Sequence, residues 1–258
     1  MDNLFDLDEI AAACGIAALE YQAEVASTND WALQLSADDE RAYPLLVLTA
    51  RQTGGRGRGA NRWWSSEGAL TFSLVIDAHR LRIASDRWPQ LALIAGLAVC
   101  QSLHKLFPTG LLALKWPNDV YLSGRKLCGI LVEAPSHARG RIVMGVGINV
   151  NNSFATASVE VRERATSLCD IAGGTFDLSE VLIEVVRQIL LRVEEFSATN
   201  LLPSCEQYCL LTGRNVQVEV GRELVVGLCQ GIADDGTLLV QTTAGLRQLH
   251  SGTVVSWD

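Results

Sequence analysis

Glycine and arginine alternate in the segment Gly54-Gly55-Arg56-Gly57-Arg58-Gly59, and this pattern suits the binding of an anion. Glycine backbone reaches positive φ and lets a ligand approach closely, as in the loops that cradle phosphates. Guanidinium groups add bidentate contacts to phosphate or carboxylate oxygens. Between Arg51 and Arg62 there are four arginines and no acidic residue, in a chain with a formal net charge of −8. The segment is therefore either an anion site or a solvated basic run.

Three neighbouring features add candidate chemistry. Ser27-Thr28-Asn29 is typical of a helix N-cap, and such a cap can also present hydroxyl groups to a polar ligand. In Lys115-Trp116-Pro117-Asn118-Asp119 a lysine lies where proline ends a strand and favours a turn. Trp63 follows the basic segment; it is either a flat surface for a nucleotide base or an ordinary core aromatic.

The apolar runs around these clusters predict the elements that hold them. Residues 45–50 and 69–77 are predicted strands that enter and leave the glycine and arginine loop. Residues 88–106 form a predicted helix that is apolar on nearly all sides and therefore packs under a sheet. Further strands are predicted at residues 111–115, 120–122, 126–133 and 141–149. In the last strand Gly145 and Gly147 leave one face bare, which allows a ligand or another backbone to come close.

The outer parts of the chain are less uniform. Residues 4–18 have helical composition, residues 154–175 have mixed character, and Asp177 with Glu180 predicts a capping box at the start of a long amphipathic helix. From Gly213 onward, short β runs separated by glycines predict a small barrel. We therefore expect two domains, 1–211 and 212–258.

Composition restricts the class of protein. A chain of 258 residues with 48% hydrophobic residues can bury a sizeable core. Its seven cysteines are scattered and contain no Cys-x-x-Cys pair, so neither a disulfide framework nor a zinc site is indicated. The sequence shows no secretory signal and no apolar stretch long enough to span a bilayer, so we expect a cytoplasmic protein without membrane contact. Overall acidity argues against nonspecific DNA binding.

Taken in order, the three clusters resemble those of the biotin protein ligases. The resemblance continues through residues 124–133, Gly145-Val146-Gly147-Ile148-Asn149-Val150 and the C-terminal β run. It implies an α+β fold: a class II synthetase-like catalytic domain with a mixed or antiparallel sheet flanked by helices, followed by an SH3-like barrel. It also implies an ATP-dependent enzyme that makes biotinyl-5′-AMP, releases pyrophosphate and transfers biotin to a lysine. The expected acceptor is the biotin carboxyl carrier protein of acetyl-CoA carboxylase or a related carrier.

The same resemblance implies roles for individual residues. The catalytic residues would be Arg56, Arg58 and Lys115. The biotin-binding residues would be Ser27, Thr28, Asn29, Gln52, Arg56, Gly57, Arg58, Lys115 and Gly129. The nucleotide-binding residues would be Arg56, Arg58, Trp63, Lys115, Asn118 and Asn149. Mg²⁺ would be held mainly by the phosphates of ATP, with no protein ligand assigned.

Two alternatives remain open at this point, a lipoate or octanoate ligase and a non-catalytic sensor of biotin or a nucleotide. The sequence also departs from the family in two places. Gly59-Ala60-Asn61 stands where many relatives continue with arginine, glycine and arginine, so Asn61 occupies the place of the third arginine. Only 26 residues precede Ser27, too few for a three-helix DNA reader, so we expect no operator binding. An exposed sheet edge could pair two copies into a homodimer.

Overall fold

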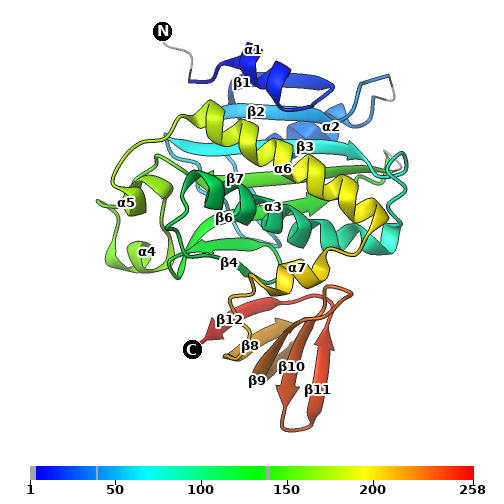
Figure 1. Ribbon diagram of the computed structural model, residues 1–258, viewed down its shortest axis with the longest axis vertical. Helices are drawn as coiled ribbons and strands as arrows, with labels where there is room; N and C mark the ends of the chain where they lie inside the picture. Colours follow the sequence, from blue (N-terminus) through cyan, green and yellow to red (C-terminus); the bar gives the residue numbers. More distant parts are fainter. Residues whose placement is uncertain (1–3, 39, 138–139) are drawn as a thin grey trace.

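The computed structural model describes residues 4–38, 40–137 and 140–258, which are arranged around two sheets of unequal size (Figure 1). The larger sheet has seven strands in the order β1-β2-β3-β7-β6-β5-β4. β1 and β2 are parallel, and every other neighbouring pair is antiparallel, so this is a mixed sheet. Its strands are β1 (Ala18–Val25), β2 (Leu45–Gln52), β3 (Ala69–Asp77), β4 (Leu112–Lys115), β5 (Asp119–Leu122), β6 (Arg125–Glu133) and β7 (Arg141–Asn149).

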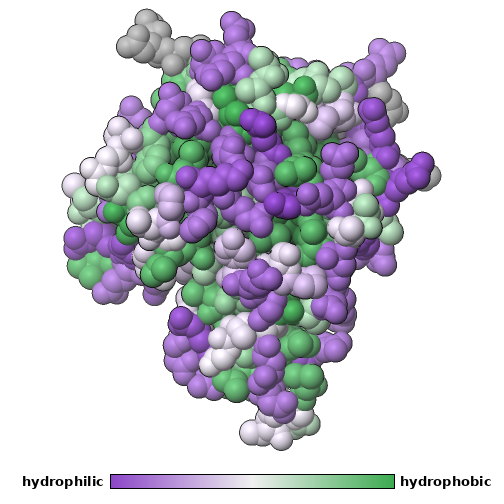
Figure 2. All heavy atoms as spheres, viewed as in Figure 1, coloured by the Kyte–Doolittle hydropathy of each residue, from purple (hydrophilic) through white to green (hydrophobic). Residues whose placement is uncertain are grey.

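Two long helices cover one face of the larger sheet (Figure 1). α3 (Leu91–Leu106) is buried almost throughout because it packs between the sheet and α6 (Leu178–Ala198), as its apolar sequence predicts. α6 begins at the predicted cap, where the Asp177 carboxylate accepts hydrogen bonds from the N–H groups of Ser179 and Glu180. The outward side of α6 is mainly hydrophilic (Figure 2). The remaining helices are α1 (Leu7–Ala13), α2 (Thr28–Leu35), η1 (Ser85–Gln90), α4 (Val159–Arg164), α5 (Leu168–Ala172) and α7 (Leu202–Glu206).

The opposite face of the larger sheet is only partly covered. Here α2 packs Ala32 against a small apolar cluster of Leu45, Val47, Val75 and Val143. Side chains alternate along a strand, so the residues that continue this face beyond the cluster are small or polar. On β3 and β7 they are Thr71, Ser73, Gly145 and Gly147, in register as Ser73 with Gly145 and Thr71 with Gly147. This uncovered strip of sheet becomes the floor of a cavity.

The smaller sheet, which we call the C-terminal sheet, follows α7. It is antiparallel and has five strands in the order β11-β10-β9-β8-β12. Its strands are β8 (Asn215–Val220), β9 (Glu223–Ile232), β10 (Leu238–Thr242), β11 (Gly245–Leu249) and β12 (Thr253–Trp257). The predicted α+β class, with a helix-flanked mixed sheet and a C-terminal β unit, is confirmed, whereas the division into residues 1–211 and 212–258 stays a prediction.

The two sheets meet at the β4 edge. The Leu114 N–H donates to the Tyr208 carbonyl (2.7 Å), and the Leu210 N–H donates to the Leu114 carbonyl (2.8 Å). Trp116 adds a link across the same junction, because its indole N–H donates to the Gly236 carbonyl (3.0 Å). The C-terminal sheet is thereby fixed beside Lys115. Within the described part of the chain, no helix is both long and apolar enough to cross a bilayer.

Candidate active site

A cavity of about 650 Å³ lies over the uncovered strip, between the larger sheet, the glycine and arginine loop and β12. It brings together the three clusters that the sequence singles out. The predicted site residues that line it are Ser27, Thr28, Asn29, Gln52, Arg56, Gly57, Arg58, Trp63, Lys115, Asn118 and Gly129. Asn149 is not among the lining residues. It is buried at the end of β7, where its side-chain oxygen accepts a hydrogen bond from Asn152 (2.9 Å).

At one end of the cavity, hydroxyl and amide groups are held by one another. Ser27 caps α2, with its hydroxyl 3.4 Å from the Asp30 N–H, so the predicted cap is confirmed. Ser27 also lines the cavity, and the presentation of its hydroxyl to a ligand stays a prediction. The Gln52 side-chain oxygen accepts from the Thr28 N–H (2.7 Å) and the Thr28 hydroxyl (3.1 Å). Ser27 and Thr28 are buried and Gln52 is half-buried, and the bonds between Thr28 and Gln52 fix the directions of these groups before any ligand is present.

Asn29 is fixed even more tightly. Its side-chain oxygen lies 2.6 Å from the Ser73 hydroxyl, and its amide N–H group donates to Glu133 (2.8 Å). A Cβ atom on Gly145 would lie 2.0 Å from that side-chain oxygen, which is far inside contact distance. Gly145 is therefore required so that the Asn29 amide can lie flat against β7.

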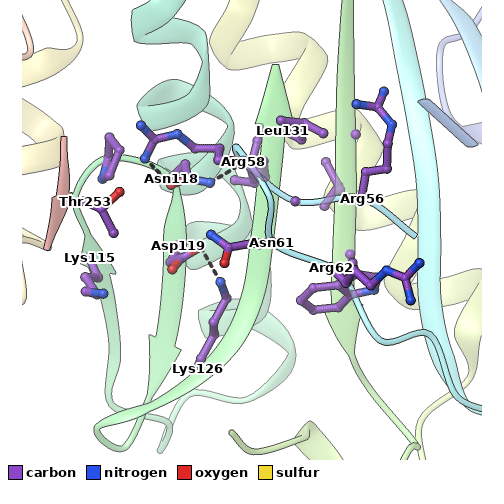
Figure 3. Close-up of a pocket in the computed structure, with 18 of the residues that line it drawn as sticks. Arg56, Arg58, Asn61, Arg62, Lys115, Asn118, Asp119, Lys126, Leu131 and Thr253 are labelled. Atoms are coloured by element: carbon purple, nitrogen blue, oxygen red, sulfur yellow. Dashed lines mark hydrogen bonds and ion pairs between the residues drawn. The ribbon is translucent and has the colours of Figure 1, made fainter. Parts of the chain in front are cut away.

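Arg56 belongs to the same end of the cavity. Its guanidinium group makes a bidentate contact with Glu133 (3.0 and 2.6 Å) and a further contact with Asp30 (2.8 Å). The hydrogen bond to Glu133, with the charges of Glu133 and Asp30, raises the pKa of Arg56. In Figure 3 the Arg56 side chain points away from Arg58 and Lys115. We call Ser27, Thr28, Asn29, Gln52, Arg56 and Glu133 the polar end.

The glycine and arginine loop folds back on itself as a narrow hairpin. The Trp63 N–H donates to the Gly55 carbonyl (3.0 Å), and the Gly57 N–H donates to the Asn61 carbonyl (2.8 Å). The Asn61 N–H closes a tight turn onto the Arg58 carbonyl (3.1 Å). Gly59-Ala60-Asn61, the stretch that departs from the family pattern, therefore forms the tip of this hairpin.

The Trp63 ring lies on the bare strip of the larger sheet. A Cβ atom on Gly147 would lie 2.3 Å from the ring, and one on Gly129 would lie 3.4 Å from it. The ring is half-buried and lines the cavity, and its buried indole N–H has no hydrogen-bond partner among the described residues. Trp63 thus packs against the sheet and also offers a surface to a ligand.

At the other end of the cavity, two cations contact backbone carbonyls of the C-terminal sheet and the turn before β12. The Lys115 ammonium donates to the Val254 carbonyl (3.0 Å) and lies 4.5 Å from the centroid of the Trp257 ring. Arg58 donates to the Gly252 carbonyl (3.2 Å) and to Asn118 (3.3 Å). Burial lowers the pKa of both Lys115 and Arg58. We call Arg58 and Lys115, with these contacts, the cationic end.

The acidic residue nearest to the cationic end is already engaged. Asp119 forms an ion pair with Lys126 (2.7 Å), which Figure 3 shows beneath the loop. Within the described ranges, no three His, Cys, Asp or Glu side chains are grouped closely enough to hold a metal ion. Asp119 therefore leaves the positive charges of Lys115 and Arg58 available to an incoming anion.

Several residues that line the cavity, or that hold its lining side chains in place, escaped the sequence analysis. Glu133 had one usable signal, an acidic side chain at the end of a predicted strand facing a basic loop. Val254 and Gly252 contribute backbone carbonyls, which leave no trace in a side-chain pattern. The lining residues not predicted as part of the site also include Tyr121, Lys126, Glu163, Arg164, Thr253 and Trp257.

This fold and site define a class of protein that comparison with known families confirms. Residues 22–150 match the model of the Biotin/lipoate A/B protein ligase family, and residues 211–257 match that of the Biotin protein ligase C terminal domain. The chain belongs to the biotin/lipoate protein ligase family, and it is a ligase. Within that family it groups with the biotin protein ligases.

Individual relatives support this placement. The biotin--[acetyl-CoA-carboxylase] ligase of Mycobacterium tuberculosis is 32% identical over 251 residues, which cover 95% of this chain and 91% of the relative. The bifunctional ligase/repressor BirA of Bacillus subtilis is 31% identical over 92% of this chain and 73% of its own length. The structure of the biotin protein ligase from Aquifex aeolicus in complex with biotin and ATP superposes with a TM-score of 0.79 at 30% identity, covering 94% of this chain and 99% of that one.

Proposed function

We propose that this ligase activates biotin with ATP to form biotinyl-5′-AMP and then transfers biotin to a lysine of a carrier protein. The observation that carries the proposal is the division of one cavity into a neutral polar end and a cationic end. The Aquifex aeolicus relative was solved with biotin and ATP, and the Mycobacterium tuberculosis relative is named for acetyl-CoA carboxylase. A biotin carboxyl carrier protein is therefore the acceptor that we propose.

The polar end suits the head group of biotin, a ureido ring that carries hydrogen-bond donors and acceptors but no charge. Thr28, Asn29 and Gln52 supply matching groups, and Ser27 adds a hydroxyl. Arg56 does not place an unpaired charge here, since Glu133 and Asp30 neutralise its guanidinium group. We therefore assign Arg56 to holding this end in shape, and we assign phosphate contacts to the cationic end.

The cationic end suits the reaction between two anions. An oxygen of the biotin carboxylate attacks the α-phosphorus of ATP, the bond from that phosphorus to the bridging oxygen breaks, and pyrophosphate leaves. Lys115 and Arg58 are positioned to bring the carboxylate and the phosphates together and to stabilise the charge that develops. Both can exchange a neutral carbonyl for an anionic oxygen, which forms the stronger, charge-assisted hydrogen bond. Trp63 offers a flat surface on which the base can stack.

In the second step the amine of the carrier lysine attacks the acyl carbon of the mixed anhydride, and AMP leaves. The ATP chemistry also implies Mg²⁺. The nearby carboxylates do not fit an ion held by protein ligands, because Asp119 is paired with Lys126 while Asp30 and Glu133 are paired with Arg56. We propose that the ion enters with the triphosphate, and no step above passes through it.

The test is to incubate the purified protein with ATP and biotin, lipoate, octanoate or no acid, and to measure pyrophosphate release. Release that depends on biotin is the expected result. Release with lipoate or octanoate instead would identify a lipoate-type ligase, and binding of biotin without release would identify a sensor. The second step is followed by labelling of a biotin carboxyl carrier protein, with a carrier whose acceptor lysine is replaced by arginine as the control.

Three further expectations about partners and location stay predictions. We expect no DNA binding, a cytoplasmic location and possible pairing of two copies through a sheet edge. β1 forms one edge of the larger sheet, and it would be the element available for such pairing. An operator-binding assay and sedimentation of the purified chain address the first and third of these expectations.

A further inference from the structure

Six cationic side chains line the cavity, and they differ in whether protein groups already contact them. The four that contact protein oxygens are Arg56, Arg58, Lys115 and Lys126. The other two are Arg62 and Arg164, whose side chains form no hydrogen bond or ion pair with any residue in the described ranges. In Figure 3 the Arg62 side chain points away from Asp119 and Lys126. Arg164, in contrast, is tied to Lys126 through the backbone.

The end of α4 holds Arg164 at the cavity by docking onto the start of β6. The Thr166 N–H donates to the Lys126 carbonyl (3.0 Å), and Ala165 forms a parallel β-bridge with the same residue. The Arg125 guanidinium group adds a hydrogen bond to a carbonyl in the last turn of α4 (3.2 Å). The backbone of Arg164 is therefore fixed one residue from the contact with Lys126, although its side chain is exposed.

Lys126 connects this exposed edge of the cavity to the cationic end. Its ammonium group pairs with Asp119 (2.7 Å), and Asp119 is the register partner of Lys115 in the pairing of β4 with β5. Figure 3 shows the Lys126 side chain reaching from β6 to Asp119. β4, β5 and β6 are adjacent in the sheet, and α4 contacts β6. An extended anion that starts at Lys115 can therefore continue past Lys126 toward Arg164.

The chemistry and the exposure of Arg164 both suit the terminal phosphates of ATP. A guanidinium group presents paired N–H donors that match two oxygens of a phosphate group. In the proposed reaction the α-phosphate lies beside the biotin carboxylate, whereas the β- and γ-phosphates leave together and have to reach solvent. A cation that binds the leaving group is expected at the exposed edge of the cavity, which is where α4 holds Arg164.

We propose that Arg164 binds the β- and γ-phosphates of ATP and retains contact with pyrophosphate as it leaves. This inference rests on the proposed formation of biotinyl-5′-AMP. In that step a carboxylate oxygen of biotin bonds to the α-phosphorus, and the bridging oxygen leaves with the electron pair of its broken bond. The negative charge that develops on pyrophosphate then meets a guanidinium group that has no protein acceptor to give up.

The first test measures the biotin-dependent exchange of labelled pyrophosphate into ATP. We expect Arg164→Ala to raise the KM for pyrophosphate and for ATP about five- to tenfold, a moderate effect because solvent screens an exposed charge. The KM for biotin should not change. Arg164→Lys keeps the charge without the paired donors and should fall between the wild type and the alanine variant. Arg162→Ala is the matched control, because Arg162 is also an exposed arginine of α4 but does not line the cavity.

A second measurement does not depend on turnover. Calorimetry on the full chain compares the binding of inorganic pyrophosphate with that of AMP. Arg164→Ala should weaken the binding of pyrophosphate and leave the binding of AMP unchanged. Glu163 also lines the cavity, so Glu163→Gln removes a negative charge beside Arg164 and should strengthen the binding of pyrophosphate.

The outcomes separate this inference from the function on which it rests. Exchange in the wild type, with the same KM for pyrophosphate in Arg164→Ala and Arg162→Ala, would overturn the role of Arg164 and leave the adenylation reaction standing. An Arg164→Ala variant that raises only the KM for the carrier protein would also overturn it, because Arg164 would then contact the carrier. A wild-type protein without biotin-dependent exchange would contradict the adenylation reaction itself, and the inference with it.

Discussion

The two ends of the cavity each hold one arginine of the glycine and arginine loop, in different electrostatic surroundings. Arg56 and Arg58 are two residues apart in one loop, yet Arg56 contacts two carboxylates whereas Arg58 contacts a backbone carbonyl and an amide oxygen. The carboxylates raise the pKa of Arg56, while burial lowers the pKa of Arg58. Within one glycine and arginine pattern, a cation paired with carboxylates therefore lies beside a cation bonded to neutral oxygens.

The two ends therefore differ in how their groups are held. The polar end is fixed by bonds among its own side chains, whereas the cations of the other end are bonded to neutral oxygens. At the polar end, hydrogen bonds between protein groups fix the direction of each donor and acceptor, which supports our proposal that a neutral ligand is recognised there by geometry. At the cationic end, Lys115 and Arg58 lie in a partly dry environment, which supports our proposal that an anion is recognised there by charge. Three substitutions and a change of pH test whether the two ends behave differently.

Removing the ammonium group at the cationic end should have the largest effect. We expect Lys115→Ala to reduce biotin-dependent pyrophosphate release by about 100-fold, because loss of one preorganised donor costs about 3 kcal/mol in the transition state. Circular dichroism checks that the variant is folded. Lys105→Ala, which removes a surface lysine paired with Glu184, is the matched control and should keep the wild-type rate. A folded Lys115→Ala enzyme with normal turnover would contradict the assignment.

Breaking the polar end should weaken biotin binding selectively. In Glu133→Ala the Asn29 amide and the Arg56 guanidinium group both lose a partner, at a cost of about 1–3 kcal/mol. We expect the KM for biotin to rise about tenfold and the KM for ATP to change little. Glu24→Ala, which removes the partner of Arg51 in an exposed ion pair, is the control. Equal increases in both KM values would show that the two ends are not separate.

The C-terminal sheet should influence the cationic end through Trp257. Its ring lies beside the Lys115 ammonium, and a cation–π contact of this kind contributes about 0.5–1 kcal/mol. We expect Trp257→Ala to raise the KM for ATP about two- to five-fold, with the KM for biotin unchanged. Trp257→Phe retains a ring and should recover part of the loss. If alanine and phenylalanine behave alike, the ring does not orient Lys115.

The smallest effect is a dependence on pH. Burial lowers the pKa of Lys115, so kcat/KM for ATP should fall on the alkaline side at a lower pH than a free lysine would give. Between the folded and unfolded pKa values the unfolded chain binds more protons, so the contribution of Lys115 to the free energy of unfolding rises with pH. Its destabilising effect is complete below the folded pKa and is lost above the unfolded one.

Chemical denaturation at several alkaline pH values tests the second part of this prediction. The free energy of unfolding of wild-type protein is compared with that of Lys115→Met, which removes the charge and keeps a similar length. We expect the difference between them to narrow as the pH rises. A difference that widens would mean that the folded protein binds the Lys115 proton more tightly than the unfolded chain does.

The sequence predicts the parts of this site that depend on local pattern. Ser27, Gln52 and Lys115 lie at or beside strand ends and helix caps, so their elements and approximate positions follow from short stretches of residues. Gly145 and Gly147 predict a bare strip of sheet, and the structure places Asn29 and Trp63 on it. The local patterns do not relate Ser27, Gln52 and Lys115 to a common ligand. That relation, to biotin, comes from the family resemblance.

The parts that sequence reasoning missed depend on long-range docking. Arg56 meets Glu133 across 77 residues of chain, and Lys115 meets Val254 across 139. These pairings follow from the order of strands and from how two sheets meet, which no local period encodes. Residues 4–18 have helical composition, yet they contain only the short helix α1. The first strand already begins at Ala18, because Ala18 pairs with Leu45 in the sheet.

The contact between Lys115 and the Val254 carbonyl also sets an order of events during synthesis. The chain emerges from the ribosome at roughly 5–20 residues per second, so the sequence separation of 139 represents on the order of ten seconds. During that interval the larger sheet can begin to fold while Lys115 and Arg58 lack their carbonyl partners. The nascent protein therefore passes through a stage in which the polar end can assemble but the cationic end is still open.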